Sequence, residues 1–472
     1  MKQLVYQLLP RLWGNGRMSG IDSPSLSYIK SLGTDYIWYT GIIRHASLSS
    51  GEKVVKGNAG SPYAITDYYD VNPYLADDKD KRLEEFVELV ERTHGAGMKV
   101  LVDFVPNHVA REYKGVLGKD DDSSVHWSPD NDFYYYPGTP LKLPVQCDYT
   151  EFPARASGNA FSSEPGIDDW WETVKINYCP FHTPTWDKMY NAVRFWALKG
   201  VDGFRCDMVE LVPWQFMKWL IARIKDEFPS VVFVAEVYEK DKYRLYTEEV
   251  GFDLLYDKSG LYDTLRAVTC SGYSARSITW NWQMLGDLQP RMLNFLENHD
   301  EQRVASDFFC GSAKAGYAAL AVSLLLNTAP FMLYFGQECG ERGMQKEGFS
   351  GLDGRTSIFD WCKVPALESP DTEVLERYKS ILSLAKAPVF SEGATYDLCY
   401  CQDGAFNPDR HFAWIRSMDG DTRVVVANFS PFPEDITVRI PPEALSYLGI
   451  KAVRTVHTVT VPSHDYVIIK IQ

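Results

Sequence analysis

Eight short apolar runs, rich in Val, Ile, Leu, Phe and Tyr, recur along the chain and are separated by helical patterns. Runs this short and this apolar are typical of parallel strands that are buried on both faces. Their alternation with helices predicts βα units, and eight such units close a (β/α)8 TIM barrel. The runs lie at residues 5–9, 35–40, 99–105, 201–207, 231–237, 252–257, 292–297 and 330–335. We therefore predict an α/β fold whose barrel comprises residues 1–106 and 172–388.

The regular alternation breaks between the third and fourth runs, over residues 107–171. This segment is rich in Asp, Pro, Ser, Tyr and Trp and is too long for an ordinary connection. Disordered segments are poor in aromatic residues, so its aromatic content favours an ordered subdomain. The aromatic residues are Trp127, Phe133, Tyr134, Tyr135, Tyr136, Trp170 and Trp171. We expect an inserted B subdomain after the third strand.

Helical patterns stop near residue 388, and short alternating strands follow. The first two, at 411–417 and 422–429, are joined by a Met-Asp-Gly-Asp turn that is typical of a hairpin. Two more strands are expected at 435–440 and 465–471. The pattern predicts a C-terminal antiparallel β-sandwich domain over residues 389–472.

Charge and hydropathy exclude two classes of partner. The 472-residue chain has a formal net charge of −15, which argues against a surface for nucleic acid. Residues 315–335 carry no charge and approach the length of a membrane span, but Asn327, Thr328 and Pro330 interrupt them. We expect a core helix that ends near Thr328, then a strand, and no membrane partner.

The cysteines and the amino-terminal residues bear on the compartment. The nine cysteines include no C-x-x-C pair and are scattered through the expected elements, which is typical of reduced thiols in a cytosolic protein. The first residues show no small-residue cleavage site. We expect a cytoplasmic protein; the sequence does not indicate an oligomeric state.

Four of the apolar runs end in charged or polar side chains. Because parallel strands in a barrel emerge at one rim, these side chains are expected to converge there. The segments are VLVDFVPNH (100–108), VDGFRCD (201–207), VVFVAEV (231–237) and MLNFLENHD (292–300). In this order they closely resemble the conserved regions of the α-amylase superfamily, glycoside hydrolase family 13. The resemblance runs from VYQLLPRLW at residues 5–13 to Gln337 and Glu338, and it implies a barrel with an inserted B domain and a C-terminal β domain.

Three carboxylates carry the expected chemistry. Breaking a glycosidic bond needs a proton for the leaving oxygen and a second carboxyl group near the anomeric carbon. The resemblance implies that Asp207 is the nucleophile, that Glu236 is the general acid and then base, and that Asp300 binds the distorted sugar. Arg205 lies two residues before Asp207, so its side chain leaves the strand on the same face and would keep Asp207 ionised.

The resemblance assigns further residues to the site. Asp103 is expected to be the structural partner of Arg205. Residues expected to contact the sugar are Tyr63, His108 and His299, together with Asp353 and Arg355 from the loop after the eighth strand.

One expected metal ligand and one departure from the family pattern concern the same rim. Asn107 matches the family's Asn that holds a structural calcium ion between the barrel and the B domain, and an amide oxygen suits that hard cation. Many α-amylases have Lys-His three and four residues after the nucleophile, whereas Glu210 and Leu211 stand here. This departure leaves the acceptor-side preferences of the site open.

The sequence thus predicts a retaining glycosidase of α-1,4-linked glucans or malto-oligosaccharides. A 4-α-glucanotransferase, or an enzyme like an α-glucosidase or a neopullulanase, could use the same residues. A more distant alternative is a non-catalytic carbohydrate-binding barrel, but none of the expected carboxylates is missing.

Overall fold

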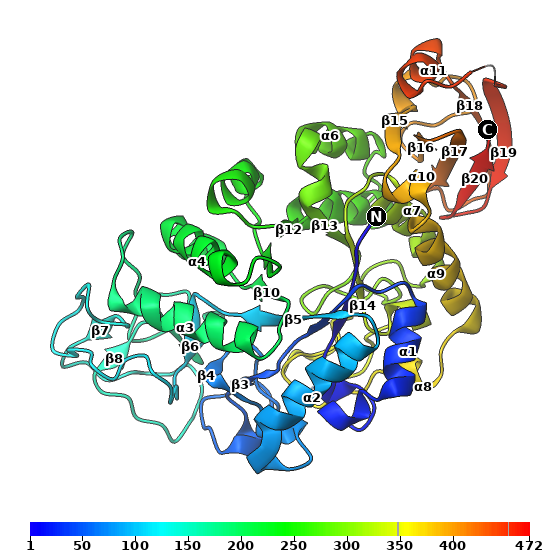
Figure 1. The fold of residues 1–472 in the computed structure, drawn as a ribbon. Helices are drawn as coiled ribbons and strands as arrows, with labels where there is room; N and C mark the ends of the chain where they lie inside the picture. Colours follow the sequence, from blue (N-terminus) through cyan, green and yellow to red (C-terminus); the bar gives the residue numbers. More distant parts are fainter. Residues whose placement is uncertain (347–348, 452) are drawn as a thin grey trace.

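A computed structural model describes residues 1–346, 349–451 and 453–472 (Figure 1). Eight parallel strands form a closed barrel, in which β1 pairs with both β2 and β14. The strands are β1 (Leu4–Leu8), β2 (Tyr36–Tyr39), β5 (Lys99–Phe104), β10 (Gly203–Cys206), β11 (Val232–Ala235), β12 (Leu254–Tyr256), β13 (Met292–Phe295) and β14 (Phe331–Tyr334). Each lies within or overlaps one of the eight apolar runs, so the predicted barrel is confirmed.

Helices surround the strands, and their buried faces follow the helical period. In α2 (Arg82–Gly95) the buried residues are Phe86, Leu89, Val90 and Thr93, which form one stripe of an amphipathic helix. The other barrel helices are α1 (Ser23–Ser31), α3 (Pro184–Leu198), α4 (Trp214–Glu227), α5 (Asp263–Cys270), α6 (Arg276–Leu285), α7 (Tyr317–Leu325) and α9 (Thr372–Ala385), with short helices α8 (Pro365–Glu368) and α10 (Pro388–Ser391).

Helix α7 lies within the long uncharged stretch, and every one of its residues is buried. It ends at Leu325, slightly before the expected end, and β14 follows after a short connection. Among the described residues, no helix is both long enough and apolar enough to cross a membrane.

An irregular segment leaves the barrel between β5 and α3 (Figure 1, at the left). It contains two small antiparallel pairs, β6 (His108–Ala110) with β9 (Thr173–Lys175) and β7 (Tyr135–Tyr136) with β8 (Ala154–Arg155). We call residues 107–183 the inserted segment. A second excursion, formed by β3 (Ile43–His45) and β4 (Ile65–Val71), lies between β2 and α2. Because β6 follows β5 directly, the inserted segment begins at the carboxyl end of the third barrel strand.

The C-terminal part is antiparallel, as predicted. One sheet has the order β15-β16-β17-β20 and a second pairs β18 with β19. The bounds are β15 (Ala394–Asp397), β16 (His411–Met418), β17 (Asp421–Asn428), β18 (Glu434–Arg439), β19 (Val456–Val461) and β20 (Tyr466–Lys470), with α11 (Pro442–Leu448) between β18 and β19. Ile415, Val424 and Ile436 belong to the core between the two sheets.

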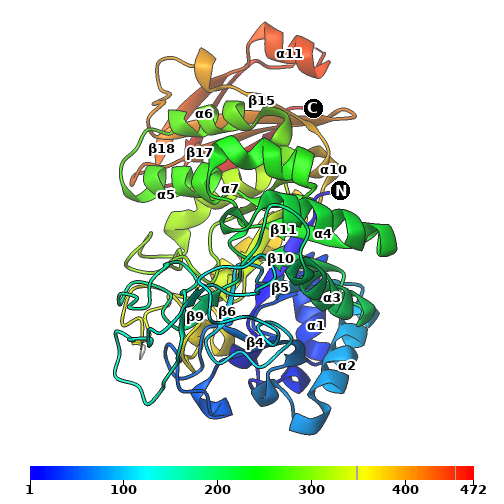
Figure 2. The ribbon, with the colours of Figure 1, turned by 90° about the vertical axis from the view of Figure 1, so that its left-hand side faces the viewer.

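The C-terminal sheet packs on the barrel beside α5, α6 and α7 (Figure 2). The Trp414 indole donates to the Leu325 carbonyl at 3.3 Å, and the Arg416 guanidinium donates to the Leu326 carbonyl at 3.0 Å. Because α7 ends here, these carbonyls have no hydrogen-bond donor from a following helical turn. Arg416 is fully buried and also donates to the Phe390 carbonyl at 2.8 Å.

Candidate active site

The ends of the neighbouring strands β10 and β11 bring together the predicted nucleophile and acid. One guanidinium contacts both carboxylates: Arg205 Nη1 lies 2.5 Å from Asp207 Oδ1, and Nη2 lies 3.0 Å from Glu236 Oε1. All three side chains are buried. The parallel register that pairs Arg205 with Val234 places Asp207 and Glu236 at the same edge of the barrel. The arrangement holds two carboxyl groups against a single cation.

Aromatic rings fix the Arg205 side chain. Its guanidinium carbon lies 5.5, 5.2 and 5.3 Å from the ring centroids of Trp38, Tyr63 and Tyr256, within the range of cation–π contacts. Its Nε donates to the Tyr256 hydroxyl at 3.2 Å. Only 1% of the Arg205 surface is exposed, so water does not screen this charge. It therefore presents a fixed positive charge to Asp207 and Glu236.

The pKa of Glu236 is raised, although the groups that hydrogen-bond to its carboxylate favour the ionised form. Burial raises its pKa, repulsion by Asp207 adds to the rise, and Arg205 opposes it. The Met208 amide donates to Oε2 at 2.9 Å, and the Tyr238 hydroxyl donates to Oε1 at 2.5 Å. Met208 reaches this carboxylate from a left-handed backbone conformation with φ of 46°, an unusual state for a residue with a side chain. A raised pKa suits a group that must deliver a proton.

Asp300 and His299 follow β13, and Asp300 lines the cavity described below. His299 contacts the cavity-lining Tyr63 but does not itself line the cavity, so its expected sugar contact stays a prediction. The His299 ring stacks on Tyr63 with centroids 5.2 Å apart, and its Nε2 lies 2.5 Å from the Tyr63 hydroxyl. The Gln7 amide donates to Nδ1 at 2.8 Å. Burial, with a contribution from Arg205, lowers the pKa of His299, so the ring is neutral. Burial and repulsion by Glu236 raise the pKa of Asp300. The Asp300 side chain is 43% exposed, so solvent screening limits this rise.

A cavity of about 220 Å³ joins these groups. His108 lines it, and burial lowers the pKa of this histidine to about 3, so it is also neutral. The lining residues are Lys56, Ser61, Tyr63, His108, Trp170, Glu172, Thr173, Asp207, Met208, Glu236, Tyr238, Asp300, Ile358 and Phe359. The structure thus places the three predicted carboxylates, Tyr63 and His108 around one space.

Asp103, the expected structural partner of Arg205, is the most distant of the three carboxylates around that guanidinium. Its Oδ1 is 3.9 Å from Arg205 Nη1, whereas Asp207 and Glu236 approach the same guanidinium more closely. The Trp38 indole donates to the other Asp103 oxygen at 3.2 Å. Burial raises the pKa of Asp103 to about 7. Asp103 is therefore a secondary partner of Arg205.

Asp353 and Arg355 do not line the cavity. They form an ion pair with each other at 2.8 Å, and Arg355 Nε donates to the Asp300 carbonyl at 2.6 Å. The turn at Gly354 is anchored away from the cavity, because the Gly354 carbonyl accepts from the Arg303 amide at 2.8 Å. Their substrate contact stays a prediction. From the same loop it is Ile358 and Phe359 that reach the cavity.

The sequence reasoning missed nine of the residues that line the cavity, among them Lys56, Glu172, Trp170 and Tyr238. Lys56 and Glu172 form an ion pair at 3.0 Å, and the Trp170 ring lies 5.1 Å from that of His108. Lys56, Trp170 and Glu172 lie in irregular segments, where the sequence has no helical or strand periodicity that could have indicated them. Tyr238 could have been found, because it lies two residues after Glu236 and strand alternation puts both on one face.

Glu210 connects the loops that follow β10 and β11. Its carboxylate accepts from the Tyr238 amide at 2.8 Å and from the Glu239 amide at 3.2 Å. This residue stands where many α-amylases have Lys. The departure thus has a structural use here: a carboxylate that ties down the segment after the predicted acid.

The described residues do not fit the predicted calcium site. The Asn107 amide oxygen accepts from the Lys175 ammonium, and the Asn107 amide nitrogen donates to the Gly158 carbonyl at 2.9 Å. Calcium takes six to eight oxygen ligands, usually including carboxylates. No group of three or more acidic, His or Cys side chains that could hold a metal occurs in the described part of the chain.

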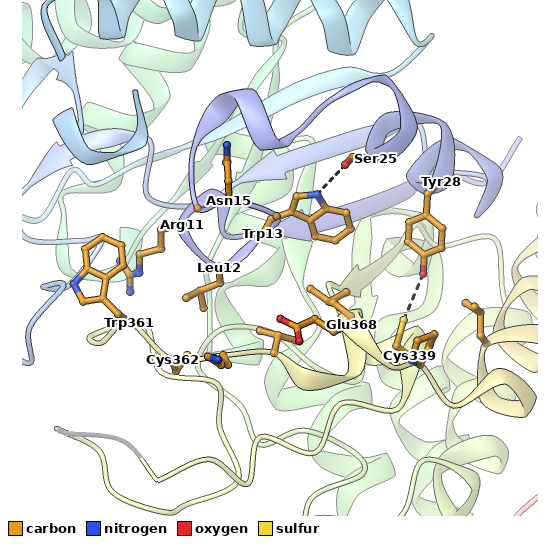
Figure 3. A pocket seen from close by; sticks show the side chains of 17 residues that line it. Arg11, Leu12, Trp13, Asn15, Ser25, Tyr28, Cys339, Trp361, Cys362 and Glu368 are labelled. Carbon is orange, nitrogen blue, oxygen red and sulfur yellow. Dashed lines mark hydrogen bonds between the residues drawn. The ribbon is translucent and has the colours of Figure 1, made fainter. Parts of the chain in front are cut away.

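A larger cavity, of about 680 Å³, lies between α1 and the segment around α8 (Figure 3). Trp13, Tyr28 and Trp361 line it, and of its described lining residues only Glu368 is acidic. A single carboxylate cannot both protonate a leaving group and manage the reacting carbon. The smaller cavity is therefore the candidate active site.

Comparisons with known proteins agree with this geometry. The family model "Alpha amylase, catalytic domain" matches residues 11–366. The α-amylase MalA of Haloarcula japonica is 29% identical over 452 residues, which cover 93% of this chain and 56% of that protein. α-Amylase 3 of Dictyoglomus thermophilum is 24% identical over 78% of this chain and 73% of its own length.

A similar fold occurs in cyclic α-maltosyl-(1→6)-maltose hydrolase from Arthrobacter globiformis, with a TM-score of 0.72 at 18% identity over 100% of this chain and 98% of that one. The matched family model spans the barrel strands that carry Asp207, Glu236 and Asp300. The resemblance seen in the sequence is confirmed: the chain belongs to the α-amylase family, glycoside hydrolase family 13.

Proposed function

We propose that this chain is a retaining glycosidase that hydrolyses α-1,4-linked glucans or malto-oligosaccharides. The observation that carries the proposal is the contact of one buried guanidinium, that of Arg205, with both Asp207 and Glu236. Such a pair provides the two carboxyl groups that glycoside hydrolysis needs. The names of the two α-amylase relatives support the substrate class.

The geometry assigns a role to each carboxylate. Glu236, with its raised pKa, gives its proton to the glycosidic oxygen while ionised Asp207 attacks the anomeric carbon. The bond from that carbon to the leaving oxygen breaks, and an ester to Asp207 forms. Glu236, now ionised, then takes a proton from water, and the water oxygen displaces Asp207 with net retention. Arg205 stabilises the negative charge on Asp207 before the attack and again when water displaces it from the ester.

The walls of the cavity suit a neutral, hydroxyl-rich ligand. Asp300 and Glu172 can accept hydrogen bonds from sugar hydroxyls, and the neutral ring of His108 offers a donor or an acceptor without adding charge. The surplus of carboxylates would repel an anionic ligand.

A 4-α-glucanotransferase, or an α-glucosidase-like or neopullulanase-like enzyme, is a second candidate for this site. The observation that favours it is the departure at Glu210 and Leu211, on the side where an acceptor would bind. In a transferase a sugar hydroxyl, not water, would attack the ester. The complete set of three carboxylates speaks against a non-catalytic barrel.

Product chromatography with maltoheptaose separates these candidates. Only shorter sugars are expected from a hydrolase, whereas products longer than the substrate would indicate transfer. NMR of the first product, before mutarotation, should show the α-anomer. A β-anomer would require inversion and would refute the assignment of Asp207 as nucleophile.

A further inference from the structure

Lys175, in β9, joins the start of the inserted segment to the loop after β10. Its ammonium donates to the Asn107 amide oxygen and, at 2.7 Å, to the Leu211 carbonyl. Asn107 comes shortly after β5, and Leu211 ends the short 3-10 turn that follows Asp207. Three segments far apart in the sequence therefore meet at one positive charge.

The ligands of this ammonium are neutral oxygens. Burial lowers the pKa of Lys175 to about 7 and no carboxylate contributes to the shift, so this side chain does not serve to neutralise an acid. The two oxygens that accept from it favour its protonated form. The Asn107 amide is fixed in orientation because its nitrogen donates to the Gly158 carbonyl at 2.9 Å. Its oxygen is thus directed at Lys175. An amide oxygen and a main-chain carbonyl that converge on one cation are the ligand types that proteins offer to hard metal ions.

We propose that the Lys175 ammonium takes the place of a divalent cation at this junction. It acts as a positioning residue that fastens the inserted segment to the loop after β10. The stability of the inserted segment and the geometry of that loop then need no calcium ion. This inference replaces the expectation of calcium at Asn107, whose oxygen is already occupied.

The loop held by Lys175 leads directly to the proposed acid. Met208, three residues before Leu211, donates its amide to Glu236 Oε2. Glu210, the neighbour of Leu211, accepts from the amides of Tyr238 and Glu239. Displacing Leu211 would therefore disturb two groups that orient Glu236, and a small misplacement of catalytic groups can lower turnover by about 100-fold.

The test uses the full chain and the variant Lys175→Met, which keeps most of the side-chain length and removes the charge. Wild-type Tm should be the same in excess EDTA and in added calcium chloride. Lys175→Met should lower both Tm and kcat on maltoheptaose, the latter by about 10–100-fold with a smaller change in KM. The kcat measurement rests on the proposed function, whereas the Tm measurements do not.

Lys188→Met is the matched control. Lys188 forms an ion pair at 2.6 Å with Asp132 of the inserted segment, but neither residue lines the cavity with the carboxylates. This control should lower Tm and leave kcat unchanged. If Lys175→Met behaves in the same way, Lys175 is only a structural contact and its positioning role is refuted.

Chemical rescue covers the case in which Lys175→Met does not fold. Lys175 lines a cavity of about 300 Å³ together with Tyr134, Phe161 and Tyr178, so a small amine can reach the space left by Lys175→Ala. Ethylammonium should raise the Tm and the kcat of this variant, whereas tetramethylammonium, which has no N–H donor, should not. The proposal is overturned if EDTA lowers the wild-type Tm and calcium restores it, or if both amines act alike on Lys175→Ala.

Discussion

Of the two cavities near the rim of the barrel, the smaller one contains the proposed catalytic carboxylates. The cavity with the carboxylates measures about 220 Å³, whereas the one beside α1 measures about 680 Å³. In the small cavity Asp207 and Glu236 contact one buried guanidinium. Burial and repulsion by Asp207 raise the pKa of Glu236. In the large one Glu368 is exposed and has no such neighbour among the lining residues.

The comparison shows that coupling between charges, more than volume, distinguishes a reactive site. Burial of paired acids is unfavourable for folding and persists where a partner such as Arg205 offsets it. A large space between loops needs no such compensation. Substitutions in the two cavities can therefore break or sharpen this distinction.

The largest contrast is expected between Asp207→Asn and Glu368→Gln. Asp207→Asn removes the nucleophile and almost no volume, so kcat/KM on maltoheptaose should fall by roughly 10⁴-fold or more. Glu368→Gln makes the same chemical change in the large cavity and should leave kcat/KM unchanged. Circular dichroism checks that both variants fold. Near-native activity of Asp207→Asn, or an equal loss in Glu368→Gln, would reverse the assignment of the two cavities.

Glu236→Gln should come next in magnitude. Removing the proton donor should lower kcat on maltoheptaose by about 10²–10⁴-fold. With α-maltosyl fluoride the loss should be much smaller in the glycosylation step, because fluoride leaves without a proton. The measurement is the ratio of single-turnover rates on the two substrates. An equal loss on both would show that Glu236 does not protonate the leaving group.

Aromatic residues of the two cavities offer a smaller contrast. Trp170→Ala should raise KM for maltoheptaose by about 3–10-fold, which corresponds to about 0.5–1.5 kcal/mol for the lost aromatic contact. Trp361→Ala, in the large cavity, is the control and should leave KM as it is. If only Trp361→Ala weakens binding, the substrate lies in the large cavity.

Tyr238→Phe should produce a shift in pH dependence. The Tyr238 hydroxyl donates to Glu236 Oε1, which stabilises the ionised carboxylate and lowers its pKa. Without this bond the pKa of Glu236 rises, so the acid keeps its proton to higher pH. The alkaline limb of kcat/KM should therefore move upward by less than about one pH unit. Tyr273→Phe, at an exposed site, should not move it. A downward movement in Tyr238→Phe would contradict this hydrogen bond's role.

Regular elements made most of the fold and the centre of the site predictable. The apolar runs located all eight barrel strands, and the alternation of side chains along a strand placed Arg205 and Asp207 on one face. Adjacent parallel strands then bring Asp207 and Glu236 to one edge. These conclusions depend on local geometry that a sequence pattern encodes.

Contacts made by residues in irregular segments could not be predicted from the sequence. The partner of the Asn107 oxygen is Lys175, 68 positions later in the chain, and no spacing rule relates two residues across an irregular insertion. The direction of Asp353 and Arg355 depends on how the turn at Gly354 is anchored to Arg303, which is a tertiary contact. Such contacts appear only when the packed structure is known.

The hydrogen bonds from Trp414 and Arg416 to the end of α7 have a consequence for folding autonomy. Because α7 is buried on every side, with the C-terminal sheet packed beside it, the barrel without that sheet would expose an apolar helix and leave its last carbonyls without these donors. The border near residue 388 therefore separates two architectures that together form one cooperative unit. Barrel and sheet are expected to unfold in a single transition, so the C-terminal domain is a permanent part of the barrel's stability and not a detachable module.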